Sequence, residues 1–449
     1  MKNYILYQLL TGLISLILTT NSFAQNPLIM NQYTADPTAR VFEGKIYLYP
    51  SHDIIAVEGK GRVGWFCMED YHVFSSSNLT DWTDHGVIVS QYNVPWVNPK
   101  SYSMWAPDCI YRNGKYYFYF PARANDSSLG RGSKIGVAIA DKPYGPFIPQ
   151  SLPIKGFSGI DPNVLIDKDG QAYIYWAGRG GLNGAKLKEN MLELASEPKV
   201  LEGLPQGFKE GPFMFERKGI YYFTFPYVID STESLAYCMG NNPLGPFKYT
   251  GVIMDKWPNG CWTNHHSIVD YKGQWYLFYH HNDLSPNFDK ARSVRADSLF
   301  FNDDGTIKKV IPTLRGIGIT DASKEIQIDR YSLKSEKNAS IAFLDTLNRF
   351  QGWETILNAA DAWIQYNSVN FGKNKYKSVK VRASSNTGGT LLIHLDRTDG
   401  PVIAQVDIPK DDKWNIINSS VLEYKQGIHN LIVRLKNNDN VKIDWVSFE

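Results

Sequence analysis

The sequence predicts an all-β protein with two domains, a five-bladed β-propeller followed by a β-sandwich of jelly-roll type. Three observations predict this architecture. A hairpin phrase recurs five times between residues 31 and 329, helical periodicity is nearly absent there, and different short strands follow Asp329. Repeats of about 40–50 residues with several strands each are typical of β-propellers. We therefore predict a signal peptide at 1–24, a propeller at 25–328 and a sandwich at 329–449.

The hairpin phrase is clearest at Phe208–Phe225. It contains an acid, a Gly-Pro step, a short strand, a turn at Lys218-Gly219 and a second strand rich in aromatic residues. This order is the signature of a β-hairpin. The other four copies have their turn glycines at Gly44, Gly114, Gly170 and Gly273.

Each copy of the phrase begins with a titratable residue. These residues are Asp36, Asp108, Asp161, Glu210 and His265. The first strand of every propeller blade lines the central channel, so we expect the five side chains to converge there. Carboxyl groups that share a small space cannot all ionise freely, which separates acid and base roles. The alternative is that Asp-Pro and Glu-Gly-Pro are only turns at strand entry.

The net charge and the N-terminal segment indicate the partners and the location of the protein. The net charge of +2 on 449 residues favours neither nucleic acid nor a membrane surface as partner. Met1–Ala24 reads as a signal peptide, with Lys2, an apolar run and Ser22-Phe-Ala24 as cleavage site. We expect a secreted or periplasmic monomer without a membrane span. A transmembrane anchor at Met1–Ala24 is the alternative.

Four cysteines leave the disulfide question open. An exported chain permits disulfides, and four cysteines allow three pairings. Cys67 with Cys109 and Cys238 with Cys261 are the pairs nearest in sequence, but four free buried thiols are equally compatible. Their spacing fits no zinc motif.

Six short motifs together resemble glycoside hydrolase family 43 over about residues 28–325. They are Asp36-Pro, Trp105-Ala-Pro-Asp108, Gly159-Ile-Asp-Pro162, Lys209-Glu-Gly-Pro212, Asn264-His-His-Ser267 and Asn302-Asp-Asp-Gly305. The resemblance implies a five-bladed propeller that hydrolyses glycosidic bonds with inversion. Inversion needs an acid for the leaving oxygen and a base for a water on the opposite face.

The resemblance also implies roles for individual residues. Asp36 matches the general base, Glu210 the general acid, and Asp161 the carboxylate that tunes and orients the acid. An ionised Asp161 would raise the pKa of Glu210 by repulsion. His265 matches a central histidine that helps hold a calcium ion, with water supplying most of the shell because calcium prefers oxygen.

Further positions are expected to contact substrate. Trp105 matches an aromatic residue of the pocket wall, and Arg292 lies where the family often has an arginine that contacts substrate. Asp108 occupies the remaining equivalent position, as a substrate contact or, in the favoured interpretation, as a structural hydrogen-bond acceptor. His280-His281 and His52-Asp53 look metal-like, but the favoured interpretation is a hydrogen-bonded rim.

The C-terminal part resembles carbohydrate-binding module family 6. The matching phrases are Trp363-Ile-Gln-Tyr366, Val381-Arg-Ala-Ser384, Gly427-Ile-His429 and Ile443-Asp-Trp445. Modules of that family hold a sugar between two aromatic rings. Trp414 and Asn440 match the stacking and hydrogen-bonding positions. Trp353 is the candidate for the second ring, with a place in the core as the alternative.

These patterns predict an enzyme that acts on plant hemicellulose. We expect an α-L-arabinofuranosidase that removes arabinose from arabinoxylan. A β-xylosidase or an endo-arabinanase of the same family is the alternative, and a non-catalytic carbohydrate-binding protein is the alternative from another class. The chemistry requires no cofactor, although a calcium ion in the channel is compatible with it.

Overall fold

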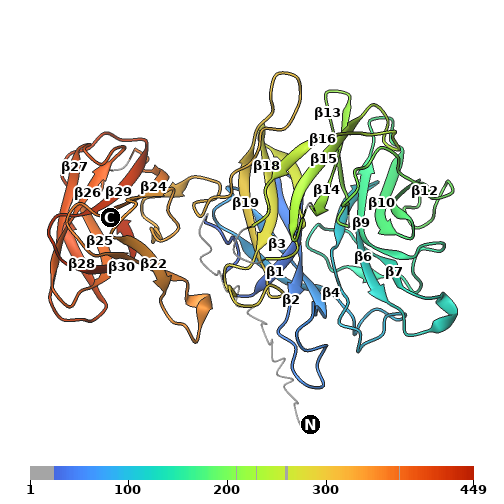
Figure 1. Cartoon of the computed structure of the whole chain (residues 1–449), viewed down its shortest axis with the longest axis horizontal. Helices are drawn as coiled ribbons and strands as arrows, with labels where there is room; N and C mark the ends of the chain where they lie inside the picture. The colour runs from blue at the N-terminus through green and yellow to red at the C-terminus, as the bar shows by residue number, and fades with distance from the viewer. Residues whose placement is uncertain (1–24, 209, 229, 258–260, 374) are drawn as a thin grey trace, which may run out of the picture.

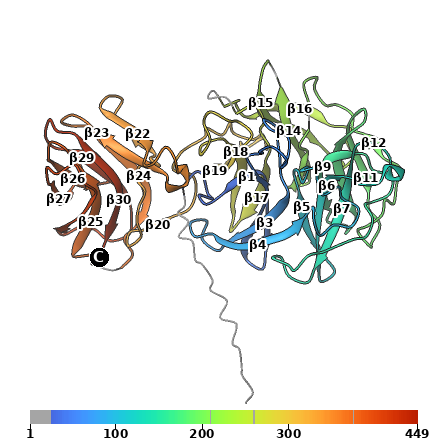
Figure 2. The ribbon, with the colours of Figure 1, turned by 90° about the horizontal axis from the view of Figure 1, so that it is seen from below.

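The computed structural model describes residues 25–449 apart from 209, 229, 258–260 and 374. The predicted signal peptide, Met1–Ala24, lies outside the described residues. In the part described, the only helices are the short 3-10 turns η1 (Ser127–Leu129) and η2 (Arg349–Gln351), so the predicted all-β class is confirmed. No helix of this part has the length and apolar character needed to cross a bilayer. Figures 1 and 2 show two lobes, one with β1–β19 and one with β20–β30.

The first lobe has five antiparallel sheets in its described residues, each built from consecutive strands. The first sheet contains β1 (Tyr33–Phe42), β2 (Lys45–Asp53), β3 (Asp70–Ser76) and β4 (Thr83–Ser90). The second contains β5 (Asp108–Arg112), β6 (Lys115–Arg123), β7 (Ser133–Ala140) and β8 (Ile148–Pro149). The third contains β9 (Gly159–Ile166), β10 (Ala172–Gly178), β11 (Gly181–Lys186) and β12 (Lys199–Val200). The fourth contains β13 (Phe213–Arg217), β14 (Ile220–Val228), β15 (Glu233–Gly240) and β16 (Lys248–Met254). The fifth contains β17 (Ser267–Tyr271), β18 (Gln274–His281) and β19 (Ser293–Leu299).

Apolar side chains pack between each sheet and the next. Tyr71 and Phe118 belong to the cluster between the first and second sheets. Similar clusters join the second sheet to the third, the third to the fourth and the fourth to the fifth. Another cluster, which includes Phe74 and Val294, joins the fifth sheet to the first. The sheets therefore follow one another around a closed ring, with their hydrophobic cores between neighbouring sheets.

The predicted turn glycines all have positive φ, as a tight hairpin turn requires. In four hairpins two consecutive residues have this conformation, the first with φ of 49–54° and the glycine with φ of 73–84°. These pairs are Glu43-Gly44, Asn113-Gly114, Lys218-Gly219 and Lys272-Gly273. Two central residues with positive φ form a type I′ turn, whose twist matches that of the strands.

The ring closes through the start of the chain. The residues that follow β19 do not close it, because residues 300–307 form only an isolated bridge, between Phe301 and Ile307. Instead, residues 26–34 run along β19, where the Leu28 N–H donates to the Val294 carbonyl at 2.8 Å. The fifth sheet therefore has three strands of its own, and the N-terminal segment lies beside its last strand.

The second lobe contains two sheets that enclose one buried core. One sheet has the order β20 (Thr320–Asp321), β24 (Trp363–Asn370), β29 (Ile428–Leu435), β26 (Gly389–Leu395) and β27 (Val402–Ile408), and β21 (Leu333–Lys334) pairs with β24. The other has the order β22 (Ala339–Phe343), β23 (Trp353–Leu357), β30 (Val441–Phe448), β25 (Ser378–Ser384) and β28 (Asn415–Ser420). Two facing sheets around one core are compatible with the predicted β-sandwich.

The second lobe begins before the predicted boundary at residue 329. β20 pairs in parallel with β24, and Ile326 forms a bridge with Val446 of β30. Residues 320–328 therefore belong to the sheets of the second lobe, although the prediction placed them in the first. No local sequence signal marks these pairings, because both partners lie more than 40 residues further along the chain.

Replacing Asn26 by alanine is expected to destabilise the ring closure. The buried side chain accepts from the Ala296 N–H (2.8 Å) and donates to the carbonyls of Ala296 (3.0 Å) and Thr313 (2.8 Å). Leaving these backbone groups unpaired should cost at least about 2 kcal/mol of unfolding free energy. Urea denaturation measures this loss. Asn241→Ala, at an exposed position, is the control. Equal midpoints for both variants would contradict the assigned role of Asn26.

Candidate active site

A pocket of about 290 Å³ lies at the end of the ring where the first strands begin. All five sheets contribute to it through these strands or through the segments that precede them. Its titratable lining residues are Asp36, Asp161, Glu210, His265 and Arg292. The structure therefore brings together four of the five side chains that the repeats predicted to converge, and the exception is Asp108.

Two β-bulges direct Asp36 and Asp161 into the pocket. Both residues precede a proline, and both have φ in the left-handed region, 46° and 57°. The register of β1 against β2 shifts at Asp36, and that of β9 against β10 shifts at Asp161, so two residues oppose one in each case. A bulge bends the strand and changes the direction of a side chain. Asp36 and Asp161 thus stand at the same kind of β-bulge in two different sheets.

Hydrogen bonds fix both carboxylate oxygens and the backbone N–H of Asp36. Arg292 donates to its Oδ1 from Nη1 (2.7 Å) and to its Oδ2 from Nη2 (3.2 Å), and Ser51 Oγ donates to Oδ2 (2.8 Å). The backbone N–H of Asp36 donates to Nδ1 of His280 (3.1 Å), a buried ring with a strongly lowered pKa because of its burial. A carboxylate held in this way has one orientation toward the pocket.

Arg292 lies between two carboxylates. Besides Asp36, it contacts Asp53, which accepts from Nε at 2.8 Å and from Nη2 at 2.9 Å. Thr263 Oγ1 accepts the second hydrogen bond from Nη1 of Arg292, at 3.4 Å. All five guanidinium N–H groups of Arg292 therefore donate hydrogen bonds. Arg292 lines the pocket as predicted, but these bonds make it an anchor of Asp36 rather than a free donor to substrate.

Asp161 is held by the segment that carries Glu210. Its Oδ2 accepts from the backbone N–H of Gly211 at 2.9 Å. Burial, and then the charges of Glu210 and Asp36, raise the pKa of Asp161 well above its ordinary value. Asp161 and Glu210 are therefore coupled both through the backbone and electrostatically.

Glu233 is a site residue that the sequence analysis missed. It is buried at the start of β15, and its Oε2 accepts from the backbone N–H of Asn264 at 2.7 Å. Burial, followed by repulsion from Glu210, raises the pKa of Glu233 well above its ordinary value. The bond fixes the segment that leads to His265. Neither Glu233 nor Asp53 stands in a repeated motif, so only the spatial arrangement reveals them.

His265 lines the pocket, and its Nδ1 lies 3.9 Å from Oδ1 of Asp36. Burial and the nearby Arg292 lower the pKa of His265 to about 3, so the ring is neutral. The neighbouring His266 points elsewhere, since its Nε2 lies 2.7 Å from Thr224 Oγ1. The structure thus favours His265 over His266 as the pocket histidine.

Asp108 is not among the residues that line the pocket. It is fully buried and accepts from Arg40 Nη2 at 2.6 Å, Asn163 Nδ2 at 3.0 Å and the Val164 N–H at 2.6 Å. Asp108 therefore joins the first strands of three neighbouring sheets, β1, β5 and β9. Its assignment as a substrate-binding residue is wrong, and the alternative of a structural acceptor is confirmed.

Aromatic residues form the walls of the pocket. Trp105 lines it as predicted, together with Phe66, Trp65 and Trp262, which the sequence analysis did not single out. Trp65 and Trp262 are each 40% exposed, so their rings are accessible to a ligand. Aromatic faces suit the apolar faces of sugar rings. These residues lie in loops, where hairpin periodicity cannot place them.

Trp353 and Trp414 do not form the predicted pair of aromatic rings around one sugar in the second lobe. Trp353 lies on β23 and Trp414 directly precedes β28, with β30 and β25 between these strands. Three strand spacings separate them by roughly 14 Å, too far to hold one sugar ring between two faces. Trp353 stacks on Phe343, with 5.1 Å between the two ring centroids. Asn440 is exposed, and Trp414 packs under the Arg382 guanidinium.

All four cysteines are buried free thiols. Burial raises the pKa of Cys238 to about 12, and it also raises the pKa values of Cys109 and Cys261. Neither of the sequence-adjacent pairs forms a disulfide, so the alternative of free thiols is the one observed.

Comparison with protein families agrees with this geometry. A model of glycosyl hydrolases family 43 matches residues 24–307, more than half of the chain. The chain belongs to glycoside hydrolase family 43. A carbohydrate binding module (family 6) model matches residues 344–449. Both predicted resemblances are confirmed, and the protein is an inverting glycoside hydrolase with a carbohydrate-binding module.

Individual relatives agree on hemicellulose as the substrate class. The xylosidase/arabinosidase 43A of Humicola insolens is 38% identical over 63% of this chain and 98% of its own length. The arabinoxylan arabinofuranohydrolase of Paenibacillus polymyxa is 26% identical over 90% of this chain and 71% of its own. A solved β-xylosidase/α-arabinofuranosidase from a compost metagenome, in complex with xylotriose and calcium-free, has 36% identity and a TM-score of 0.58. It covers 64% of this chain and 97% of its own.

Asp161→Asn is expected to stabilise this family 43 enzyme at neutral pH. The pKa of Asp161 lies well above 3.8, so the native state binds more protons than the unfolded state. The contribution of Asp161 to the stability of the natural protein therefore falls as pH rises from about 4 through the raised pKa. Asparagine does not ionise, so the variant lacks this pH-dependent loss of stability. The unfolding free energy of the variant, relative to that of the natural protein, should therefore rise by up to about 1.4 kcal/mol per pH unit in that range.

Urea denaturation between pH 4 and pH 8 measures this difference. The control is Asp169→Asn, an exposed carboxyl group on the turn of the same sheet, for which we expect no such trend. A stability difference for Asp161→Asn that stays constant across the range would refute the raised pKa.

Proposed function

We propose that the enzyme is an exo-acting α-L-arabinofuranosidase that removes arabinose side chains from arabinoxylan. In this proposal the five sheets are the blades of a five-bladed propeller, and the second lobe is a jelly-roll. The observation that carries the proposal is the small pocket of about 290 Å³, with carboxyl groups and aromatic walls. Its volume is at the lower end for ligand pockets, which suits a terminal sugar rather than a long stretch of polymer.

Asp36 is the general base in this mechanism. The bonds from Arg292 and Ser51 fix its carboxylate, and the bulge directs it into the pocket. From there it removes a proton from a water molecule, which attacks the anomeric carbon on the face opposite the leaving group. Inverting enzymes separate base and acid by roughly 6.5–9.5 Å to leave room for this water.

Glu210 is the general acid, and Asp161 is its positioning residue. Repulsion between two close carboxyl groups is mutual, so the pair titrates as a unit and retains a proton to higher pH than either would alone. The mechanism places this proton on Glu210, which delivers it to the leaving oxygen. The bond from the Gly211 N–H to Asp161 fixes the segment of the acid.

A hydrated calcium ion beside His265 is compatible with the pocket, although family 43 enzymes need no cofactor for catalysis. His265 offers a neutral nitrogen, while Asp36 is engaged by Arg292. In the described residues no group of three potential ligands forms around His265, so water would supply the rest of the shell. Such an ion would add positive charge to the channel.

A β-xylosidase activity is the second candidate. Relatives that match the catalytic domain at 36–38% identity are called xylosidase/arabinosidase or β-xylosidase. The relative that matches along 90% of this chain is called an arabinoxylan arabinofuranohydrolase, and this similarity across both lobes favours the first candidate.

Export and polymer binding complete the proposal. The signal peptide predicted at Met1–Ala24 would direct the enzyme outside the cytoplasm, where hemicellulose is found. N-terminal sequencing of the mature protein would test it, with Gln25 as the expected first residue. The family 6 module would keep the enzyme near its polymer, through a surface other than a Trp353–Trp414 clamp.

A substrate panel tests the specificity. We expect release of nitrophenol from the aryl α-L-arabinofuranoside to exceed release from the aryl β-D-xyloside by at least about tenfold in kcat/KM, a difference of about 1.4 kcal/mol in transition-state binding. Arabinoxylan should yield free arabinose, measured by anion-exchange chromatography. Preference for the xyloside, with xylose released from xylo-oligosaccharides, would establish the second candidate instead.

Alanine variants separate the roles of Asp36 and Glu210. Each should lose on the order of 10²–10⁴-fold in kcat on natural substrates. A dinitrophenyl leaving group departs without protonation, so Glu210→Ala should retain much of its rate on that substrate, whereas Asp36→Ala should not. Stopped assays on both substrates measure the contrast, and NMR of the first product should show the inverted anomer. The reverse pattern would exchange the two roles.

A further inference from the structure

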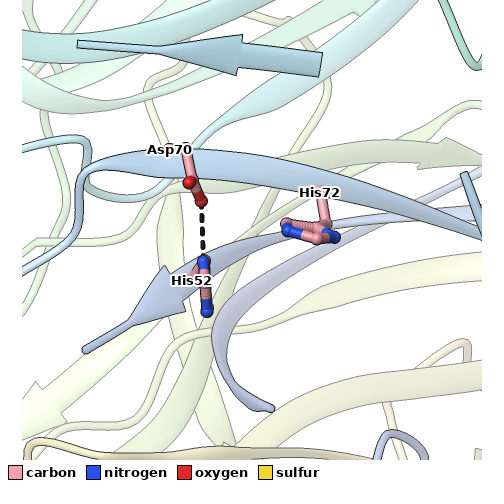
Figure 3. A group of neighbouring side chains, drawn as sticks. All are labelled: His52, Asp70 and His72. Carbon is pink, nitrogen blue, oxygen red and sulfur yellow. Dashed lines mark hydrogen bonds and ion pairs between the residues drawn. The ribbon is translucent and has the colours of Figure 1, made fainter. Parts of the chain in front are cut away.

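A second cluster of polar side chains lies in the first sheet, outside the active site. His52 is next to last in β2, and Asp70 and His72 stand at the start of β3. Ser51 pairs with Tyr71, so His52 and Asp70 are opposite one another, and His72 lies on the same face two residues later. One potential ligand atom from each residue lies within 4.8 Å of the other two. Figure 3 shows His52 and Asp70 facing one another, with His72 beside them.

The ligand types in this cluster suit a zinc-like ion. Two imidazoles and one carboxylate form a common set for a tetrahedral zinc site with water in the fourth position. His52 Nδ1 and Asp70 Oδ1 are 2.7 Å apart, and the two imidazole centroids are 5.1 Å apart. Ligand atoms on a tetrahedral zinc with bonds of about 2.0–2.1 Å lie roughly 3.3 Å from each other. The His52–Asp70 pair must therefore widen slightly to receive an ion, and the His72 ligand atom lies within 4.8 Å of both partners.

A further carboxylate orients one of the imidazoles. Both oxygens of Asp84 lie near Nδ1 of His72, at 3.0 and 3.2 Å, and Asp84 also accepts from the Gly86 N–H at 2.7 Å. Nε2 is then the nitrogen of His72 that remains for an ion. A carboxylate behind a metal-binding histidine is a recurring feature of zinc sites, since it fixes the tautomer and strengthens the ligand.

The cluster lies at the base of a pocket loop. Residues 54–69 connect β2 to β3, so His52 precedes the loop, and Asp70 and His72 follow it. The loop supplies Trp65 and Phe66 to the pocket wall. Its ends are already joined by one bond, from the Ile54 N–H to the Cys67 carbonyl at 2.9 Å. A metal ion bound to residues on both sides would close the loop more firmly.

We propose that His52, Asp70 and His72 bind a zinc-like divalent cation that clamps the base of loop 54–69. The ion is separate from any ion at His265, because the three ligands do not line the pocket. It acts on the rigidity of the wall that carries Trp65 and Phe66 and takes no part in bond cleavage. Only its effect on substrate binding rests on the proposed function, since metal binding itself can be measured without substrate.

Zinc stoichiometry tests the site directly. The mature, tag-free protein is stripped with a chelator, dialysed against zinc chloride and analysed by mass spectrometry of the metal. We expect the His52→Ala/His72→Ala variant to bind one zinc fewer per chain than the natural protein. His265→Ala should keep this zinc, and so should His85→Ala, a control in the same sheet whose ring lies near Ser75. Asp70→Asn, which retains a hydrogen-bonding side chain, should bind zinc more weakly.

Limited proteolysis tests the clamp. Lys60 and Arg62 are exposed trypsin sites within the loop. Zinc that binds only the closed loop, at 100 times its Kd, should slow cleavage there by up to about 100-fold in the natural protein. The double histidine variant should be cleaved at the same rate with and without zinc. Both measurements are independent of glycosidase activity, so a wrong substrate assignment would leave them unchanged.

Two results would overturn the proposal. If the natural protein and the double histidine variant bind equal amounts of zinc, His52 and His72 form only a hydrogen-bonded rim. If zinc binds at these residues but leaves trypsin cleavage of the loop unchanged, the ion does not clamp the loop. The melting temperature of each variant in zinc-free buffer shows whether it is folded, and Asp70→Asn provides the comparison if the double variant is not.

Discussion

The guanidinium of Arg292 between the carboxylates of Asp36 and Asp53 is the interaction on which the active site depends. Two buried carboxylates without a cation would repel one another and lose hydration. Arg292 joins them with five hydrogen-bond donors, of which four reach the two carboxylates. In the described part of the chain, Asp161 and Glu233 form no salt bridge and accept instead from the backbone N–H groups of Gly211 and Asn264. One cation thus fixes Asp36 and Asp53, whereas the backbone fixes the other two carboxyl groups.

This pairing forms at the place where the ring closes. Asp36 and Asp53 belong to the first sheet, whereas Arg292 directly precedes β19 of the fifth, 239 residues after Asp53. The Thr34 N–H donates to the Arg292 carbonyl at 3.0 Å as part of the same closure. Closing the ring and pairing Asp36 with its cation are therefore one structural event. Loosening the N-terminal segment would disturb the orientation of Asp36 as well as the stability of the ring.

Much of this arrangement could be predicted because it repeats. Turn glycines at similar positions indicate equivalent hairpins, and the residues that begin them, such as Asp36 and Asp161, share one end of the ring. Contacts between distant, unrepeated residues leave no such pattern. Long-range packing determines the ring closure along β19. It also places Asp53 beside Arg292 and buries Glu233 near the pocket. Asp108 shows the limit of the repeat argument, because an equivalent position can serve to join sheets rather than to face the pocket.

Chemistry and specificity have different origins in this enzyme. The carboxyl groups of Asp36 and Asp161 stand on bulged strands whose backbone is fixed on both sides by the sheet. The walls come from loops, with Trp65 and Phe66 on the connection 54–69 and Trp262 on the segment before β17. Loops change readily without disturbing the scaffold that holds these carboxyl groups. An arabinofuranose and a xylopyranose present the same bond to the carboxyl groups and differ in ring shape. Under the proposed function, we therefore expect the choice between these sugars to depend on where the loop aromatic rings stand relative to the carboxyl groups.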